Sequence, residues 1–503
     1  MKGSNPIADI TLVLEGTYPF MNGGVSHWVH QLISGLPQFT FSLIFLGSTE
    51  ESYSGLRFRL PDNVTHLQCF YLWGNEEFET PRERSGNVDN FAVVEHLHDW
   101  FRSKGDFCTA PVIGHFLREL ANPKGRAIAD FYFSNSAWHF ICQRYSESKC
   151  RHASFADYFW TVRMMHAPLL KLARGAASIP RGRVVHSVSN GYAGFLAVVL
   201  KQLQEIPFML TEHGIYSKER KIDLQSSYIE DCDDLFSDPP PHGMQEHRYM
   251  WIRHFEGLSR FVYSEANPIL SCHEGNRRRQ VKDGAADERT HVIPNGINLT
   301  NYVALRSKRP EKIPMVLGLI GRMVPIKDIK TFIRAMRVVA TRLPAAEGWL
   351  IGPEAEDPKY GDECRQLVAN LGLEANVRFL GFQDLDTIFP QLGLLVLTSI
   401  SEAFPLVLLE AFATGVPVLT TNVGACREII EGNTAEDKAL GSAGSVVPIA
   451  DPEATAEAAI ALLTDETRWK AAQRTAIERV ERYYSEPRFL GAYGEVYQAA
   501  LGD

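Results

Sequence analysis

The sequence predicts an α/β protein built on two parallel β-sheets, and three features lead to that expectation. A short apolar run at 10–14, a loop with Gly23-Gly24, a helical apolar stripe and a second apolar run at 41–46 form one βαβ unit. A second alternation of strand and helix patterns starts near residue 315. The chain of 503 residues is long enough for two or three domains.

The composition is that of an ordinary globular protein, with 45% hydrophobic and 22% charged residues. A formal net charge of −9 argues against a dedicated nucleic-acid binder. The longest apolar runs are far shorter than the ~20 residues that a bilayer requires, and the N-terminus has no signal-peptide pattern. The eight cysteines include no CxxC pair, so we expect neither a disulfide framework nor a zinc site. We therefore expect a cytoplasmic protein that does not itself insert into a membrane.

The first domain is expected at residues 1–305. Its strand patterns lie at 10–14, 41–46, 183–189, 207–212, 261–264 and 291–293. Between about 48 and 183 the alternation stops and aromatic residues and histidine accumulate, which we interpret as a large insertion with helical pieces at 91–101 and 157–172. Extra helices packed on the sheet are the favoured interpretation, and a partner or acceptor surface is the alternative. The stretches 215–247 and 276–279 are expected to be a loop and a basic turn.

The second domain is expected at residues 306–484, after a polar linker at 298–314. Its strand patterns lie at 315–320, 348–351, 377–380, 394–398, 416–420 and 445–447. A clear helical stripe starts at Asp328. Residues 485–503 are expected to form a helix, after a break near Pro487, that returns to the first domain. Two such domains predict a cleft between the strand-end loops of both sheets.

Glu402 and Glu410 are the first candidate ligand-binding residues. They lie eight apart in Ser-Glu-Ala-Phe-Pro-(x4)-Glu-Ala, directly after a strand pattern, and Pro405 suits the first turn of a helix. Glu410 would lie in the apolar part of that helix, where a carboxylate is costly without a hydrogen-bonded partner. A hydroxyl-rich ligand would provide one. For either glutamate alone, a contact with solvent or an arginine is the more ordinary interpretation.

Arg322 and Lys327 follow the strand pattern at 315–320 in Gly-Arg-Met-Val-Pro-Ile-Lys-Asp and lead into a helix. Two cations at such a loop, together with the positive end of the helix, suit a diphosphate. The ordinary alternative is a pair of solvated surface cations.

Three further residues lie at strand ends of the first domain. Gly23 and Gly24 would let backbone N–H groups approach a phosphate or a sugar, although a simple turn is equally compatible. His213 ends a strand pattern and could bind a sugar hydroxyl, although a single histidine is more often structural. The two DxD sequences at 231–233 and 384–386 are interpreted as a loop and a helix N-cap, so we expect no metal site.

Together these motifs resemble those of the family-four retaining glycosyltransferases. The resemblance rests on Gly-Arg…Lys and the spaced glutamates, on Ile293-Pro294-Asn295-Gly296-Ile297, and on Gly415-Val416-Pro417-Val418, Gly424 and Glu428. It covers nearly the whole second domain. The runs 14–20, 23–29 and 60–64 are narrower, and they resemble the cytoplasmic glycosyltransferases of bacterial Pel exopolysaccharide synthesis.

The resemblance implies a GT-B fold with two Rossmann-like domains, a UDP-sugar donor, a polysaccharide acceptor and no required metal or cofactor. It also implies inner-membrane partners of a Pel synthase. In this family Arg322 and Lys327 would bind the diphosphate, Glu410 the ribose hydroxyls, and His213 the sugar near the reacting carbon. Glu402 would hold the donor sugar with backbone N–H groups of the next helix. The other residues implied in donor binding are Gly23, Gly24, Asn295, Gly321, Gly352, Phe382, Phe404, Pro405, Leu406 and Val407.

The function expected from this resemblance is retaining, metal-independent transfer of a hexose to a growing exopolysaccharide, with UDP-glucose or a UDP-N-acetylhexosamine as donor. Two alternatives remain open. One is a UDP-sugar epimerase of the same fold, and the other is a catalytically silent scaffold of a membrane polysaccharide synthase. The intact glutamate pair and Lys327 favour transfer.

Overall fold

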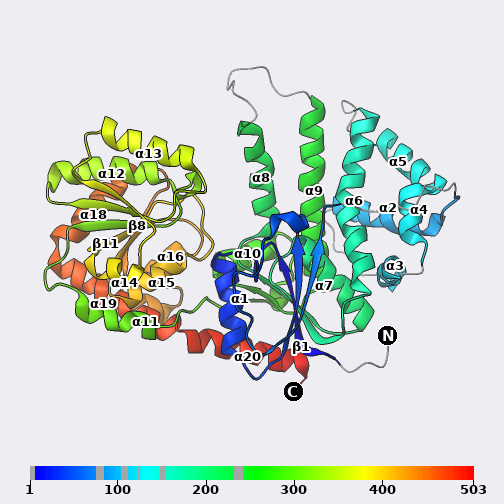
Figure 1. Cartoon of the computed structure of the whole chain (residues 1–503), viewed down its shortest axis with the longest axis horizontal. Helices are drawn as coiled ribbons and strands as arrows, with labels where there is room; N and C mark the ends of the chain where they lie inside the picture. Colours follow the sequence, from blue (N-terminus) through cyan, green and yellow to red (C-terminus); the bar gives the residue numbers. More distant parts are fainter. Residues whose placement is uncertain are drawn as a thin grey trace. The chain divides into compact units, whose positions relative to one another are not determined.

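The computed structural model describes residues 6–74, 84–102, 111–122, 125–147, 154–230 and 242–502. The chain divides into two compact units (Figure 1). The first comprises Met1–Ser271, Arg277–Val292 and Gly494–Asp503, and the second comprises Cys272–Asn276 and Ile293–Tyr493. The division at 292/293 assigns residues 293–305 to the second unit.

The first unit contains a seven-stranded parallel sheet in the order β3-β2-β1-β4-β5-β6-β7. Its strands are β1 (Ala8–Glu15), β2 (Phe41–Gly47), β3 (Val64–Tyr71), β4 (Gly182–Ser187), β5 (Phe208–Glu212), β6 (Ile269–Ser271) and β7 (Thr290–Val292). Helices α1 (Gly24–Gly35) and α7 (Gly191–Gln204) follow β1 and β4. The edge strand β3 lies inside the segment interpreted as insertion. Its side chains are mostly half-buried, so it lacks the continuous apolar run of a central strand.

The insertion proper lies between β3 and β4 and is helical. It contains α2 (Val88–Arg102), α3 (Pro111–Ala121), α4 (Ala127–Phe133), α5 (Asn135–Glu147) and α6 (Phe155–Ala176). Many of its aromatic and aliphatic side chains share one core with α7, because Phe116, Phe131 and Leu170 pack in the same cluster as Phe195 and Leu196. This supports packed helices as a role of the insertion.

Three expectations for the end of the first unit are wrong. Residues 261–264 belong to helix α9 (His242–Glu265), since their apolar run continues the helical stripe of Phe255 and Leu258. Within 215–247, helix α8 (Tyr216–Glu230) and the start of α9 replace much of the expected loop, whereas the acidic stretch with 231–233 lies outside the described residues. The expected basic turn is part of α10 (Glu274–Lys282), in which three consecutive arginines are followed by the buried Gln280.

The second unit contains a six-stranded parallel sheet in the order β10-β9-β8-β11-β12-β13. Its strands are β8 (Val316–Ile320), β9 (Glu347–Ile351), β10 (Val377–Gly381), β11 (Leu394–Leu397), β12 (Val418–Thr421) and β13 (Gly444–Val447). All six match the predicted strands within a few residues. The topological switch point of this sheet, where the strand order reverses, lies between β8 and β11. Open α/β sheets bind ligands at such a point.

The helices of the second unit flank this sheet on both faces (Figure 1). They include α11 (Thr300–Val303), α12 (Ile329–Arg342), α13 (Pro358–Asn370), α14 (Leu385–Ile388), α15 (Leu406–Ala413), α16 (Cys426–Glu431), α17 (Ala435–Lys438), α18 (Pro452–Thr464) and α19 (Glu466–Tyr483). The polar segment 298–314 contributes α11 and the buried Leu305 to this unit. Helix α20 (Glu486–Leu501) follows a short break, and its residues from Gly494 belong to the first unit.

Helix α20 is fixed in the first unit by a buried tyrosine. The Tyr497 hydroxyl lies 2.8 Å from Nδ1 of His186 on β4, and the other ring nitrogen of His186 lies 2.9 Å from Oγ1 of Thr211 on β5. No helix among the described residues is long and apolar enough to cross a membrane.

Candidate functional site

The carboxyl ends of β8, β9 and β10 are joined through backbone hydrogen bonds that glycine N–H groups donate. The N–H of Gly321 donates to Ile351 O (2.9 Å), and the N–H of Gly352 donates to Gly381 O (2.8 Å). Gly352 has φ = +147°, and a Cβ there would lie 1.9 Å from the carbonyl oxygen of Gly321. A side chain at Gly352 is therefore excluded, and the loop that carries Arg322 is held close to β9.

The loop after β11 is bonded to the loop after β8. Oγ1 of Thr398 donates to the carbonyl oxygens of Lys327 (3.1 Å) and Asp328 (2.9 Å), and the N–H of Ile400 donates to Ile326 O (2.9 Å). These bonds explain how two sequence motifs 75 residues apart come together. They position Lys327 directly beside Glu402.

Lys327 and Glu402 form the central ion pair of this site. Nζ of Lys327 lies 2.5 Å from Oε1 of Glu402, and the side chains are only 18% and 13% exposed. The Ser399 hydroxyl donates to the same carboxylate oxygen at 2.6 Å. An ion pair this sheltered interacts more strongly than a solvated surface pair.

Gly424 lies close against the backbone of Glu402 and Ala403. It has φ = +49°, and a Cβ there would lie 2.1 Å from the carbonyl oxygen of Glu402 and 2.5 Å from that of Ala403. The N–H of Ala425 donates to Ala403 O at 2.8 Å. The segment after β12 thus fixes the backbone of the glutamate loop.

Helix α15 begins at Leu406, with Pro405 as its N-cap residue, one position later than expected. The first N–H groups of a helix have no acceptor within the helix and carry the positive end of its dipole. One expectation needs correction: Pro405 has no N–H, so the backbone donors of this segment are those of Phe404, Leu406 and Val407. Phe404 is buried, whereas Leu406 and Val407 are half-buried.

Arg322 is held by a carboxylate that the sequence analysis did not consider. Its Nη1 lies 2.5 and 2.7 Å from the two carboxylate oxygens of Glu356, and both side chains are about half exposed. Glu356 lies between β9 and α13. A second carboxylate, Glu354, pairs with Arg365 nearby in sequence, so this loop brings two acidic side chains to the strand ends.

Glu410 is half-buried on α15 and is hydrogen-bonded to the Tyr302 hydroxyl. Burial, followed by the negative charges of Glu410 and Asp386, raises the pKa of Tyr302. A tyrosine of the chain itself is therefore hydrogen-bonded to Glu410, which the sequence analysis expected to contact a ligand hydroxyl, solvent or an arginine. Sequence reasoning missed Tyr302, because the pairing depends on α11 packing against α15.

Two other predicted residues differ strongly in exposure. Phe382 directly follows β10 and is 83% exposed, which is unusual for a phenylalanine. Asn295 is buried, and the next residues pair with the end of α19, since the N–H of Ile297 donates to Tyr484 O (2.9 Å). Phe382 thus lies at the strand ends of the second sheet. Asn295 instead lies next to the residues that pair with the chain just after α19.

The predicted residues of the first unit are Gly23, Gly24 and His213. The two glycines lie at the start of helix α1, and Trp28 of that helix contacts His213. Gly23 caps α1, Gly24 begins it, and a Cβ on either would meet nothing within 4 Å. Trp28 on the same helix packs edge-on against His213, with 4.6 Å between ring centroids. Burial lowers the pKa of His213 to about 4, so its imidazole is neutral at pH 7.

Two carboxylates at strand ends of the first unit, the buried Glu212 and the half-buried Glu15, were missed. Glu212 accepts from the Tyr263 hydroxyl (2.6 Å) and from Nε2 of Gln280 (3.0 Å), and burial raises its pKa to about 7. Glu15 accepts from the N–H of Ala193 in the first turn of α7 (3.2 Å) and from the Tyr216 hydroxyl (3.3 Å). Glu212 directly precedes His213 in the sequence, yet only the fold reveals the partners of the two carboxylates.

The arrangement in the second unit is suited to a ligand with several negative charges and hydroxyl groups. Two cations, a helix N-terminus and two carboxylates lie on loops at one edge of the sheet. The predicted N-cap role of Asp384 is confirmed, because its carboxylate accepts from the N–H of Asp386 (3.0 Å).

Solved structures with the same fold include HepE of Anabaena in complex with UDP, with a TM-score of 0.57 and 14% identity. That match covers 98% of this chain and all of HepE. Sucrose-phosphate synthase from Thermosynechococcus elongatus matches with a TM-score of 0.56 and 18% identity, over 98% and 99% of the two chains. The predicted GT-B fold, with two Rossmann-like parallel-sheet domains, is confirmed.

Residues 314–465, which lie in the second unit, match the family described as "Glycosyl transferases group 1". Residues 8–288 match the family described as "Domain of unknown function (DUF3492)", and the chain belongs to that family.

Two curated relatives match over a little more than a third of the chain. N-acetyl-alpha-D-glucosaminyl L-malate synthase of Bacillus anthracis is 35% identical over 191 residues, or 37% of this chain and 46% of that enzyme. The lipopolysaccharide core mannosyltransferase LpsB of Rhizobium meliloti is 28% identical over 190 residues, or 37% and 52%. The chain thus spans about half the length of these two relatives.

Proposed function

We propose that the chain is a retaining glycosyltransferase that moves a hexose from a UDP-sugar to a growing exopolysaccharide. The observation that carries this proposal is the sheltered Lys327–Glu402 pair at the edge of the second sheet, beside the N-terminus of α15. The UDP in the HepE structure and the sugar-transferring names of the relatives support a UDP-sugar as the donor.

The second unit would bind the donor. Lys327, Arg322 and the positive end of α15 would stabilise the negative charge that develops on the leaving diphosphate. Glu402 would accept hydrogen bonds from the sugar hydroxyls, and Glu410, shared with Tyr302, from the ribose. Because fixed cations are already present, we propose that the reaction requires no metal ion.

An exposed aromatic ring supports the placement of the base. Phe382 presents most of its surface to solvent at the end of β10, next to the Gly352–Gly381 hydrogen bond. Stacking of a uracil ring would cover this surface. Gly352 lies on the adjacent strand end, as expected for a base pocket.

In the transfer step the bond between the anomeric carbon and the phosphate oxygen breaks, and the acceptor oxygen bonds to the same face of the sugar. The acceptor proton passes to the leaving phosphate oxygen. His213 would contact the sugar as a neutral imidazole, since burial keeps its pKa near 4. Gly23 and Gly24, whose Cβ positions are open, would approach the phosphate through their backbone N–H groups.

We further propose that the chain is similar to PelF, the glycosyltransferase of Pel exopolysaccharide synthesis and biofilm formation. The N-terminal runs at 14–20 and 23–29 support this. A relative described as an exopolysaccharide phosphotransferase of Streptomyces coelicolor, 35% identical over 246 residues, is compatible with an exopolysaccharide context. We propose a cytoplasmic location, with attachment to the inner membrane through synthase partners.

Calorimetric titration of the purified chain with UDP and a panel of UDP-sugars, in buffer with EDTA, tests the donor site. We expect one UDP-sugar to bind, and Glu410→Ala to weaken that binding at least tenfold because the ribose loses its acceptor. Glu457→Gln is the matched control, since this glutamate forms an exposed ion pair with Arg342 on α12. Binding that appears only with added magnesium would contradict metal independence.

Donor turnover separates the remaining candidates. An epimerase would convert one UDP-sugar into another without an acceptor, and a silent scaffold would turn over none. The anomeric configuration of a product, determined by NMR, decides whether transfer retains it. No binding of any nucleotide or nucleotide sugar would refute the enzyme proposal.

A further inference from the structure

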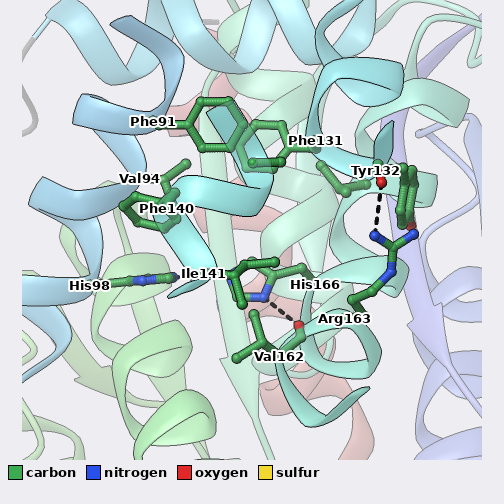
Figure 2. Close-up of a pocket in the computed structure, with 12 residues that line it drawn as sticks. Phe91, Val94, His98, Phe131, Tyr132, Phe140, Ile141, Val162, Arg163 and His166 are labelled. Carbon is green, nitrogen blue, oxygen red and sulfur yellow. Dashed lines mark hydrogen bonds between the residues drawn. The ribbon is translucent and has the colours of Figure 1, made fainter. Parts of the chain in front are cut away.

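Two apolar cavities lie among the helices of the first unit, and their lining does not include Gly23, Gly24 or His213. Their volumes are about 40 and about 80 Å³. Figure 2 shows the smaller one, enclosed by aromatic rings from α2, α4 and α5 and by side chains of α6. The cavities share Val94, His98, Phe131, His166 and Leu170 as lining residues, so they adjoin one another.

Two histidines that line both cavities, His98 and His166, are hydrogen-bonded to each other. Nε2 of His98 lies 2.9 Å from Nε2 of His166, and Nδ1 of His166 lies 2.7 Å from the carbonyl oxygen of Val162 (Figure 2). Since a carbonyl can only accept, Nδ1 of His166 carries the proton and its Nε2 accepts from His98. Burial lowers the pKa of His166, which keeps this ring neutral.

A third histidine lines the larger cavity and differs from the other two. His254 on α9 is only 5% exposed, and its ring centroid lies 6.3 Å from that of His166. Among the residues that the structure describes, its buried Nε2 has no hydrogen-bond partner. Buried polar atoms are nearly always hydrogen-bonded, so an atom of this kind at a cavity wall indicates a missing partner.

The rest of the larger cavity is apolar. Apart from the three histidines, every lining side chain is aliphatic or phenylalanine. Among the described residues that line it there is no carboxylate, lysine or arginine, so a charged ligand would lose its hydration without compensation. Arg163 lines only the smaller cavity, where it donates to the Tyr132 carbonyl at 2.9 Å.

We propose that this cavity is a binding site for a compact, uncharged, largely apolar molecule that forms one hydrogen bond with Nε2 of His254. Apolar protein cavities of roughly 150 Å³ bind benzene, and the larger cavity here holds about 80 Å³ beside the adjoining one of about 40 Å³. The ligand therefore has about the size of one six-membered ring with one hydroxyl or similar group.

The site joins the insertion to the sheet domain. Helices α2, α3 and α6 supply one wall, and α7 and α9 supply the other. The residue after His254, Phe255, packs edge-on against Tyr216, whose hydroxyl donates to Glu15 at the end of β1. A bound molecule would thus brace α9 next to the strand ends, and this inference does not depend on the proposed transferase activity.

Titration of the full chain with phenol and with toluene, followed by calorimetry, tests the proposal. Phenol can donate to or accept from Nε2 of His254, whereas toluene has nearly the same shape and no polar group. We expect phenol to bind with one-to-one stoichiometry and at least tenfold more tightly than toluene. In His254→Leu we expect phenol to bind no more tightly than toluene.

Leu169→Phe on α6 is a second variant that fills the larger cavity without touching His254. It should weaken both probes at least tenfold, while the heat of UDP binding in the second unit stays unchanged. Equal affinity of the wild-type chain for phenol and toluene overturns the proposed hydrogen bond. Absence of saturable binding of either probe, as expected if only water enters, overturns the site.

Discussion

Replacing Gly424 with alanine tests whether the backbone of the glutamate loop determines the site. The new Cβ would lie 2.1 Å from the Glu402 carbonyl oxygen and 2.5 Å from that of Ala403. Those oxygens must move by about 1 Å to reach a tolerable contact of ~3 Å. The movement breaks the Ala425 N–H bond to Ala403 O, which is 2.8 Å long, and shifts Glu402 away from Lys327.

The cost can be divided into two parts. Alanine at a left-handed φ costs about 1 kcal/mol, and the clash with the lost hydrogen bond adds about 2 kcal/mol. Gly372→Ala is the matched control, because Gly372 has φ = +65° in the same unit and its Cβ would meet nothing within 4 Å. We therefore expect about 3 kcal/mol of destabilisation at Gly424 and about 1 kcal/mol at Gly372.

Hydrogen exchange measured by mass spectrometry resolves this effect by segment. Peptides from β11 to α16 should lose protection in Gly424→Ala and keep it in Gly372→Ala. Calorimetry should show at least a tenfold loss of UDP-sugar affinity only in Gly424→Ala, because a displacement of about 1 Å removes Glu402 from its position. Equal destabilisation of the two variants, within about 0.5 kcal/mol, would refute the reasoning.

Three other predictions follow from single contacts. Glu356→Gln should raise UDP affinity about threefold by calorimetry, since a half-exposed pair worth ~0.7 kcal/mol no longer competes for Arg322; unchanged affinity argues against that competition. Burial lowers the pKa of His254 to about 3, whereas the unfolded value is ~6.5, so only the unfolded chain gains this proton between those values. Stability should therefore fall as pH drops below ~6.5, and the melting temperature of wild type should fall more steeply than that of His254→Leu; parallel curves would contradict this. Arg479→Met should cost about 3–5 kcal/mol in denaturant unfolding, because it leaves the buried Asp437 unpaired, and a loss below 1 kcal/mol would contradict a buried pair.

The middle of the second sheet could be predicted well from sequence because β11 is a short, continuous apolar run and both β11 and β12 are fully buried. The same rule failed at 261–264. An apolar run of four residues fits a buried strand and a buried helix equally well, and only the longer stripe of α9 decides between them. Edge strand β3 was missed for the opposite reason, since its partly exposed face carries His66 and Gln68.

Some residues of the candidate site could likewise be predicted from the sequence, and others could not. Residues in strand-end loops, such as Arg322 and Lys327 after β8 and Glu402 after β11, could be placed from sequence because the carboxyl ends of parallel strands share one edge. Their partners could not, because Glu356 and Tyr302 come from segments with no distinctive pattern. Charge alone does not tell which carboxylate a given arginine meets.

The partners that sequence reasoning missed bear on how the site works. In the structure Arg322 already binds a carboxylate, Lys327 binds Glu402, and Glu410 binds Tyr302. The Lys327–Glu402 pair is sheltered from solvent, whereas the Arg322–Glu356 pair is half exposed. A diphosphate donor must therefore exchange these contacts for its own, and its net affinity is the difference between the two sets. Variants that remove only an internal partner, such as Glu356, should then strengthen binding, whereas variants that remove a ligand contact, such as Glu410, should weaken it. Opposite signs at Glu356 and Glu410, two acidic residues of the second unit, are an outcome that general electrostatics of a −9 chain does not produce.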